Sequence, residues 1–553
     1  MKKLICILMT LVMVGLTACG STGNTPAENE GNAAVQDNEE AVADTSTTEP
    51  AAEADKGEKV VTMGVTGAWM SLCHVLWPSK DVQMVFTAPL FDTPAIPNSE
   101  GKIEPRLLSS WEATDDTYSV YVAKVNPDAY WHDGEKVTAQ DFVFTFKTLL
   151  NPAFDGEFQD KFLLGTDDGG KCADPDSLGI EALDDETVQF TLKSGMAADT
   201  YFAGFRYCYV IPEHLLKDVD PAALATDPFW ENPVGTGPFK FDSYIDGERM
   251  EYVVNDNYYL GTADFDRLII KVVDSSALLS ALMSGDVDMT AYSSALSAND
   301  LKMAEESENL NTVVTEGYAH DHLLINNKKF DTAQRIALNY IVDKSLCAQA
   351  AFGEYATPAI AMFRPEHPFY SSVIEDLQYE HDAQKGIQML QEAGFDFNQT
   401  YTIHVQSDQP QRVAAATVLQ QTWTEAGIKC EIIQADMATI SAGLFEGSFD
   451  FAVMGSAGTN YNPTNEGFYY WVDGWNQMTD PTAANLVDAI DTALTFEEQY
   501  ELCEQFQEFQ MKESPMIYLF HRMQTFTISK RISGCDVGGF GLKNWKYWEW
   551  TVE

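Results

Sequence analysis

Residues 130–146 read YWHDGEKVTAQDFVFTF and contain signals for a strand, a turn and a helix. Tyr130 to Gly134 is predicted to be a strand that ends in an Asp-Gly turn. Thr138 is a favourable N-cap, and Phe142 and Phe146 are spaced i, i+4, so the pattern predicts a helix from Ala139 onward. Just before this stretch, residues 118–125 alternate between apolar and polar side chains, which predicts another strand.

A second informative stretch is FDFAVMGSAGTNYNPTN, residues 449–465. Residues 449–454 form a short apolar run that predicts a buried strand. In open α/β sheets, the loop beyond the carboxyl end of a strand is where ligands collect. The polar residues that follow are therefore candidate ligand contacts: Ser456, Thr459, Asn460, Tyr461 and Asn462. The same composition also fits a surface turn rich in Gly, Asn and Pro.

Length and charge limit the possibilities. The chain of 553 residues is too long for one compact core, so we expect two to four domains. Its formal net charge is −50, so phosphate backbones would be repelled and we expect no nucleic-acid partner. The 45% apolar fraction is sufficient for folded domains.

The first residues indicate export. Lys2 and Lys3 precede an apolar run of about a dozen residues, which is too short to span a bilayer. Residues 1–19 resemble a bacterial lipoprotein signal, because small residues precede Cys19. The resemblance implies that Cys19 becomes a lipidated N-terminus, although ordinary secretory cleavage beside an incidental cysteine is the alternative. Residues 20–58 hold ten acidic residues and no aromatic one, which predicts a disordered acidic tether.

No recognisable catalytic or metal motif is present. After Cys6 and Cys19, seven cysteines are left, far apart and without a C-x-x-C pair, and their disulfide pairing is left open. His320 and His322 share one face of a predicted strand, but no cysteine or carboxylate partner lies at a recognisable spacing. We therefore predict no catalytic residues, no metal and no cofactor. A secreted hydrolase is a weak alternative, since neither G-x-S-x-G nor H-E-x-x-H occurs.

Four collinear runs resemble one family. The first contains Ser-Trp-Glu, Trp-His-Asp-Gly and Thr-Ala-Gln-Asp, at 110–112, 131–134 and 138–141. The others are residues 232–289, with Gly-Thr-Gly-Pro at 235–238, residues 323–344, and residues 379–394. Together these runs resemble the extracellular solute-binding proteins of ABC importers, in the large peptide/nickel-type class. Some members bind nickel or haem. We expect most motif residues, Trp131 and Arg335 included, to have structural roles.

The resemblance implies an α/β fold of the two-lobed periplasmic-binding-protein type (type II, class C) with an extra subsidiary domain on the first lobe. The first lobe would comprise residues 59–100, 205–315 and 518–553, and the subsidiary domain residues 101–204. The second lobe would be residues 316–517. Two crossings, near residues 318–324 and 516–520, would form the hinge.

The implied function is capture of an oligopeptide or related small solute between hinged lobes, followed by delivery to ABC permease subunits. We expect a monomer that is extracytoplasmic and held at the cell membrane only through its lipid anchor. An oligosaccharide-binding importer component is one alternative. A surface receptor or sensor for a signal peptide is another.

Further candidate ligand contacts flank the binding loop. They are Trp69, Met70, Arg364, Asp408, Arg412, Tyr469 and Trp471, each of which could instead pack in the core or order a helix start. In peptide-binding members, the strand runs into Gly-Trp-x-x-Asp, whose Asp pairs with the ligand's amino group. Here Ser456 takes the Trp position and Thr459 the Asp position. The missing carboxylate predicts that a free peptide N-terminus is not held in the usual way.

Overall fold

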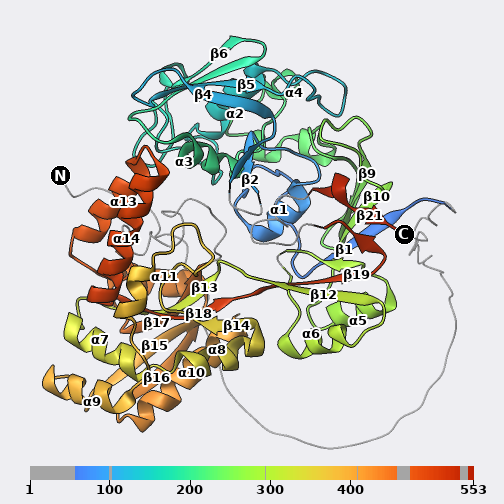
Figure 1. Cartoon of the computed structure of the whole chain (residues 1–553). Helices are drawn as coiled ribbons and strands as arrows, with labels where there is room; N and C mark the ends of the chain where they lie inside the picture. Colours follow the sequence, from blue (N-terminus) through green and yellow to red (C-terminus); the bar gives the residue numbers. More distant parts are fainter. Residues whose placement is uncertain (1–56, 99–101, 293, 408, 457–473, 536–545) are drawn as a thin grey trace, which may run out of the picture. The chain divides into compact units, whose positions relative to one another are not determined.

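The computed structural model describes residues 57–553, apart from 99–101, 293, 408, 457–473 and 536–545 (Figure 1). Three main sheets of seven, six and four strands organise these residues, with two additional two-stranded ribbons. The ribbons are β2 (Ala95–Pro97) with β3 (Ile103–Pro105), and β20 (Ile532–Ser533) with β21 (Thr551–Val552).

The seven-stranded sheet draws its strands from three distant parts of the chain, in the order β12-β19-β11-β1-β10-β9-β8. β1 is parallel to β10 and β11, whereas the other pairs are antiparallel. The strands are β1 (Val60–Val65), β8 (Phe239–Ile245), β9 (Arg249–Val254), β10 (Arg267–Val272), β11 (Met289–Thr290), β12 (Leu310–Thr315) and β19 (Gln524–Ser529). Helices α1 (Asp81–Thr87), α5 (Leu278–Ser284) and α6 (Ala298–Glu305) lie in the intervening segments.

The four-stranded sheet has the order β4-β5-β7-β6 and is antiparallel throughout. Its strands are β4 (Leu108–Ala113), β5 (Val120–Val125), β6 (Ile180–Asp184) and β7 (Thr187–Thr191). The helices of this part are α2 (Ala139–Leu149), α3 (Ala198–Ala203) and α4 (Glu213–Leu216).

The helix predicted from the opening stretch is confirmed. α2 begins at Ala139 with a capping box, because the Asp141 carboxylate accepts a hydrogen bond from the Thr138 backbone N–H at 2.8 Å. Phe142 and Phe146 are both fully buried. The strand predicted for residues 130–134 is wrong, since only a single bridge joins Tyr130 to Lys136 around the turn. β5 also starts two residues late, because Tyr118 has a φ of 53° and belongs to the preceding turn.

The six-stranded sheet has the order β14-β18-β13-β17-β15-β16. Its strands are β13 (His320–Ile325), β14 (Ala356–Pro358), β15 (Thr400–Gln406), β16 (Lys429–Ala435), β17 (Phe451–Ser456) and β18 (Met516–Arg522). Its helices are α7 (Thr332–Ile341), α8 (Lys344–Phe352), α9 (Ala383–Glu392), α10 (Pro410–Glu425), α11 (Met437–Glu446), α13 (Thr482–Thr492) and α14 (Phe496–Glu513).

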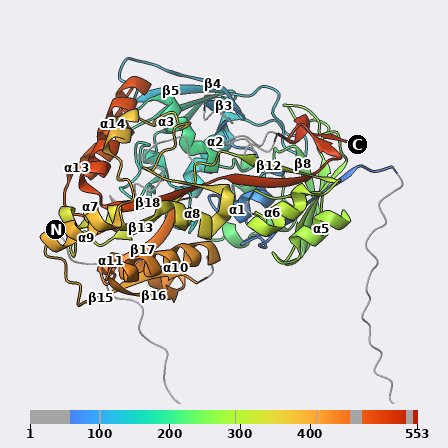
Figure 2. The same cartoon turned by 60° about the horizontal axis from the view of Figure 1, so that its bottom comes forward.

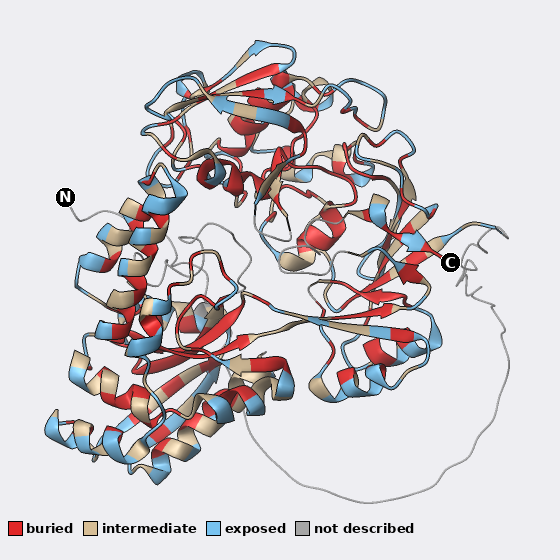
Figure 3. Cartoon of the chain, viewed as in Figure 1, coloured by how far each residue is buried: buried red, intermediate tan, exposed pale blue. Residues whose placement is uncertain are grey.

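Central strands of this sheet are buried on both faces (Figure 3). Phe451 and Val453 of β17 pack into one apolar cluster, and Ala452 and Met454 pack into another on the opposite face. Burial of both faces explains why the sequence shows a continuous apolar run there rather than an alternating one. The predicted strand is thus confirmed, shifted by two residues.

Two short segments connect the seven-stranded and six-stranded sheets. Residues 316–319 lead from β12 to β13, and Met523 alone separates β18 from β19 (Figure 2). Before and after the connections the same two chain segments are paired: β12 with β19 in the seven-stranded sheet, and β13 with β18 in the six-stranded sheet. The crossings predicted near 318–324 and 516–520 lie next to these connections, since residues 320–324 belong to β13 and residues 516–520 to β18. Which residues act as a hinge stays a prediction. The lobe boundaries themselves stay a prediction.

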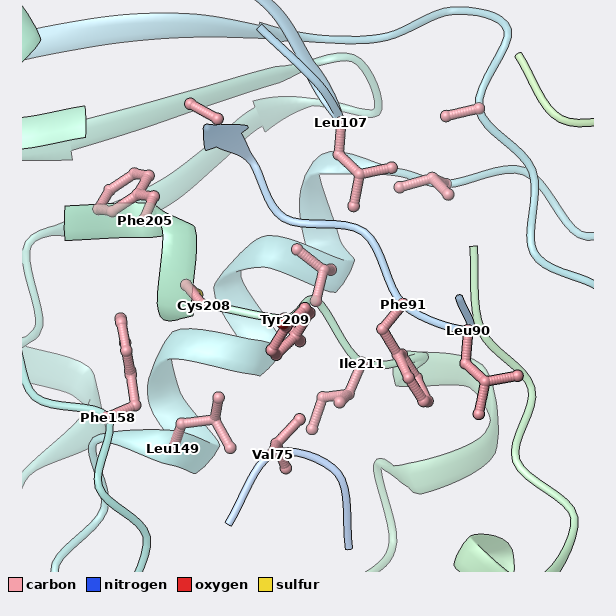
Figure 4. Close-up of a cluster of buried hydrophobic side chains, with 14 of the residues drawn as sticks. Val75, Leu90, Phe91, Leu107, Leu149, Phe158, Phe205, Cys208, Tyr209 and Ile211 are labelled. Carbon is pink, nitrogen blue, oxygen red and sulfur yellow. The ribbon is translucent and has the colours of Figure 1, made fainter. Parts of the chain in front are cut away.

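The largest apolar cluster joins residues of the seven-stranded and four-stranded sheets. Figure 4 shows part of it, where Phe205, Cys208 and Tyr209 pack near Leu149 and Phe158. Cys208 is one of seven described cysteines, all of which are free thiols and six of which are buried. Within the described residues, no helix is long and apolar enough to cross a membrane.

Candidate functional site

The carboxyl ends of four strands meet along one edge of the six-stranded sheet. β15, β16 and β17 run parallel, and β18 has the same direction because both β17 and β18 pair antiparallel with β13. His320, at the start of β13, therefore lies between Ser456 of β17 and His521 of β18. We call this the six-stranded edge. Ligands of open α/β sheets bind at such carboxyl ends.

A buried carboxylate organises the six-stranded edge. Asp321 of β13 is only 1% exposed. Its Oδ1 atom lies 2.7 Å from Nε of Arg412, in the first turn of α10, and its Oδ2 lies 2.9 Å from Nε of Arg522, the last residue of β18. One anion is thus paired with two cations, and the three side chains come from β13, α10 and β18. A buried charge is tolerated only when it is paired in this way.

Gly455 makes room for this cluster. It faces Asp321 directly across the β13–β17 ladder. A Cβ atom at position 455 would lie 2.3 Å from Oδ1 of Asp321 and 2.6 Å from Nη2 of Arg412. No real side chain could be placed there without moving the buried charges. This glycine is therefore required by the close approach of Asp321 and Arg412.

Ser456 is fixed at the end of β17 through its backbone. Its carbonyl oxygen accepts a hydrogen bond from Nη2 of Arg522 at 2.9 Å, and the residue is buried. Most of the predicted binding loop follows it. Thr459, Asn460, Tyr461, Asn462, Tyr469 and Trp471 lie outside the described residues, as do Asp408 and Cys19, so their roles stay predictions.

Arg364 lies beside the first connecting segment. Its buried guanidinium forms ion pairs with Glu316 and Glu366 and donates from Nη1 to the carbonyl oxygen of Gly317 at 3.3 Å. Glu316 and Gly317 belong to the 316–319 connection, so Arg364 ties that connection to the six-stranded part. This arrangement gives Arg364 a structural role, and a direct contact with ligand is still a prediction.

Trp69 and Met70 follow the carboxyl end of β1, in the seven-stranded part. Trp69 is half-buried and packs edge-on against Phe86, with ring centroids 5.2 Å apart, and against Tyr244 at 5.9 Å. Met70 is 53% exposed, and its backbone N–H donates to Oε1 of Gln83 at 2.9 Å. Trp69 therefore has the packing role that was its alternative, while Met70 is available to solvent.

The sequence did not single out Tyr292, which follows β11. Because β11 is parallel to β1, Tyr292 lies beyond the same edge of the seven-stranded sheet as Trp69. Burial raises the pKa of Tyr292 well above its usual value, and the nearby charges of Asp81, Arg206 and Arg522 also act on it. Arg522 belongs to the six-stranded sheet, and its charge opposes the rise in the pKa of Tyr292.

Buried histidines line the six-stranded edge. The His320 ring centroid is 5.4 Å from that of His322 and 6.2 Å from that of His521. Burial lowers the pKa of His320 to about 4 and the pKa of His367 to about 3, so both rings are neutral near pH 7. No group of three or more His, Cys, Asp or Glu in the described part of the chain is placed to hold a metal ion.

Several motif residues are structural, as expected. A Cβ at Gly235 would lie 1.9 Å from the carbonyl oxygen of Leu90, so the Gly-Thr-Gly-Pro turn is a close backbone contact. His132 accepts from the Gly235 N–H at 3.1 Å and contacts the Gly237 carbonyl at 3.0 Å. Arg335 donates to the carbonyl oxygens of Phe330 and Glu513 and thus anchors α7. Residues 128–134 and 255–259 also line a cavity of about 490 Å³ that includes no residue of the six-stranded edge.

Comparison with known proteins gives a consistent result. The model of the family described as "Bacterial extracellular solute-binding proteins, family 5 Middle" matches residues 102–479. Heme-binding protein A of Haemophilus influenzae is 27% identical over 469 residues, covering 79% of this chain and 82% of that protein. Di/tripeptide-binding protein 1 of Pseudomonas aeruginosa is 25% identical over 465 residues, covering 80% and 85%.

Solved structures show the same fold. The ABC transporter substrate-binding protein CtaP of Listeria monocytogenes superposes with a TM-score of 0.78 at 21% identity, covering 90% of this chain and 99% of that chain. The oligopeptide-binding protein AppA of Bacillus subtilis, in complex with a nonapeptide, gives a TM-score of 0.72 at 21% identity, covering 90% and 99%. The predicted two-lobed α/β fold of periplasmic binding proteins is therefore confirmed.

Asp321→Asn should destabilise the protein strongly. The substitution keeps the side-chain shape but leaves the guanidinium groups of Arg412 and Arg522 without a counter-charge, and breaking a buried pair in this way costs about 3–5 kcal/mol. Thermal unfolding measured by calorimetry should show the loss. The control is Asp264→Asn, which breaks the more exposed Lys59–Asp264 pair at 3.0 Å and should have a far smaller effect. Similar small shifts in both variants would contradict the role assigned to Asp321.

Acidification should destabilise the protein between about pH 6.5 and pH 4. The folded-state pKa of His320 lies below its unfolded value, so the unfolded chain binds more protons as the pH falls through this window. The unfolding midpoint, measured from pH 8 to pH 4, should decrease mainly below pH 6.5. His320→Gln should make that decrease smaller, whereas His381→Gln, at an exposed position, should not. An equal slope for His320→Gln and the unmodified protein would contradict the prediction.

Proposed function

Because this chain belongs to the bacterial extracellular solute-binding proteins of family 5, we propose that it captures an oligopeptide or related small solute between two hinged lobes and delivers it to the permease of an ABC importer. The family is one of solute-binding proteins rather than enzymes, and its members are extracytoplasmic. The observation that carries the proposal is the pair of short connections, 316–319 and Met523, which join the seven-stranded and six-stranded sheets.

Hinged capture requires a few residues that absorb a change of backbone angle. The two connections suit this role, because they are short, adjacent and flanked by paired strands. The solute would shift the hinge equilibrium through contacts made only in the enclosed state. In the proposed division, residues 59–100, 205–315 and 518–553 form the first lobe, 101–204 the subsidiary domain and 316–517 the second lobe. The end of β18 at Arg522 supports moving the last boundary from 517 to 522, so that the first lobe would resume at Met523.

An oligopeptide is the leading solute class, since relatives include a di/tripeptide-binding protein and a protein crystallised with a nonapeptide. The mode of anchoring would differ from that of peptide binders with an acidic residue after β17. Thr459 offers a hydroxyl there, and the nearby carboxylate of Asp321 already neutralises two arginines. A peptide with a blocked amino terminus, or an oligosaccharide on an aromatic surface, fits these residues better than a free ammonium group.

Residues 1–58 would attach the protein to the outer side of the cell membrane. Cleavage before Cys19 and lipidation of its sulfur would give an anchor that does not span the bilayer. The acidic residues 20–58 would then act as an extended, self-repelling tether. A receptor or sensor for a signal peptide is the alternative function, and neighbouring permease and ATPase genes would favour import.

Mass spectrometry of the purified protein should detect a bound peptide or small solute, returned intact after hours of incubation.

In calorimetry, N-acetylation of a binding peptide should weaken binding by less than about tenfold. An ammonium group held by a buried carboxylate would lose about 2–5 kcal/mol, or about thirtyfold and more, on losing its charge. Much tighter binding of free amino termini would show that another carboxylate, such as Asp408 or Asp473, takes this role. Cleavage of the peptide would favour a hydrolase.

Globomycin should block removal of the leader if Cys19 is lipidated. In treated cells, mass spectrometry of the membrane fraction should show a precursor whose mass exceeds that of the mature protein by the mass of the leader before Cys19. In untreated cells, the mature protein should carry acyl chains on Cys19. The matched variant Cys19→Ser should lack acyl chains and should not respond to globomycin. Unchanged processing of the unmodified protein under globomycin would refute the anchor.

A further inference from the structure

Helix α3 of the four-stranded part contacts α14 of the six-stranded part. Nε2 of Gln499 donates a hydrogen bond to Oγ1 of Thr200 at 2.8 Å, across 299 positions of sequence. Both residues are buried, with Thr200 8% and Gln499 5% exposed. Nε2 of Gln499 also lies 3.2 Å from the carbonyl oxygen of Ile490. One glutamine side chain therefore links α3, α13 and α14.

The turn between α13 and α14 is built to present this contact. Thr495 caps α14 by accepting from the Glu498 N–H at 3.1 Å, and the Glu498 carboxylate accepts from the Leu494 N–H at 3.1 Å. This reciprocal pair fixes the turn as a capping box does. A Cβ atom at Gly195, just before α3, would lie 3.4 Å from Cδ2 of Leu494. The side chain of Leu494 therefore lies close to the backbone of Gly195, near the hydrogen bond.

The contact lies away from the two connections. Figure 1 shows the end of the α13–α14 hairpin near α3, apart from the place where β18 runs on toward β19. If the connections are the hinge, a rotation about them moves distant points furthest. Opening must then separate Gln499 from Thr200, whereas contacts beside the connections, such as Tyr355 with Glu305, move little.

We infer that the end of the α13–α14 hairpin, with Leu494 and Gln499, is a latch that grips α3 through Thr200 and slows release of the enclosed solute. The latch rests on the proposed hinged capture. Because the two groups give up bonds to water when they pair, one buried neutral hydrogen bond shifts the equilibrium between the open and enclosing states by only about fivefold. Thr200 and Gln499 are therefore positioning residues: they touch no solute, and they set how long the enclosing state lasts.

Hydrogen exchange of the solute-free full chain tests the latch without any knowledge of the solute. Thr200→Val removes the hydroxyl and keeps the side-chain shape, and it should speed exchange in residues 195–203 and 490–500 about fivefold. Thr200→Ser keeps a hydroxyl at this position and should keep the slow exchange of the unmodified protein. The matched control is Thr166→Val, which removes a buried hydrogen bond from Oγ1 to the Leu163 carbonyl oxygen, at 2.8 Å, within the same part of the chain.

Three results would overturn the latch. The first is an unchanged exchange rate in residues 195–203 and 490–500 of Thr200→Val, and the second is an equal increase of that rate in Thr166→Val. The third is an increase in Thr200→Val that spreads over all three sheets. A second measurement separates the latch from the proposed function. Dissociation of N-acetyl-trialanine that carries a fluorophore at its carboxyl end should be about fivefold faster from Thr200→Val, with the association rate unchanged. Failure of this peptide to bind the unmodified protein would count against the proposed capture of short blocked peptides, and the exchange result would still decide the latch.

Discussion

The ion pairs of Asp321 with Arg412 and Arg522 hold the functional end of the six-stranded sheet together. Through them, β13 is joined to α10 and to the last residue of β18. Arg522 extends the network to the carbonyl oxygen of Ser456, where β17 ends. The next residue after Arg522 is the connection to the other sheet. A single buried carboxylate therefore fixes the start of the binding loop and one side of the proposed hinge at the same time.

This arrangement also determines which chemistry the edge can offer. A carboxylate that is shared by two guanidinium groups has no spare charge for a ligand ammonium group. The neighbouring histidines add no positive charge near pH 7, because burial keeps His320 neutral. The charges of Asp321, Arg412 and Arg522 are thus paired with one another, and we expect this part of the edge to hold no ligand ammonium group.

The sequence predicted the fold class well because its evidence was collinear and local. The helix at Ala139 and the strand at Phe451 follow from caps and apolar runs, which depend only on near neighbours. The apolar, strand-like runs at 318–324 and 516–520 predict the chain crossings to within a few residues, because β13 and β18 adjoin the two connections. Short connections such as Met523 leave no composition signal, since one residue between two strands looks like a continuous strand.

The site was harder to predict because its contacts are long-range. Arg412 was identified as either a ligand residue or part of a helix start. Its partner lies 91 positions away, which no local pattern reveals. Asp321 was overlooked between the two histidines of the apolar run HDHLLI, although a charge inside a buried strand must find a partner. Such a residue is a better marker of a buried ion-pair cluster than the loops that first attract notice.

The net charge of −50 and the arginines of the two edges act at different ranges. At physiological ionic strength, the Debye length is about 8 Å, so exposed carboxylates on distant surfaces have little influence on a solute inside the site. Buried pairs are screened much less, and the Arg522–Asp321–Arg412 cluster keeps its full local effect. The acidic surface therefore acts on solubility, while the paired charges of this cluster set the local electrostatic field at the six-stranded edge.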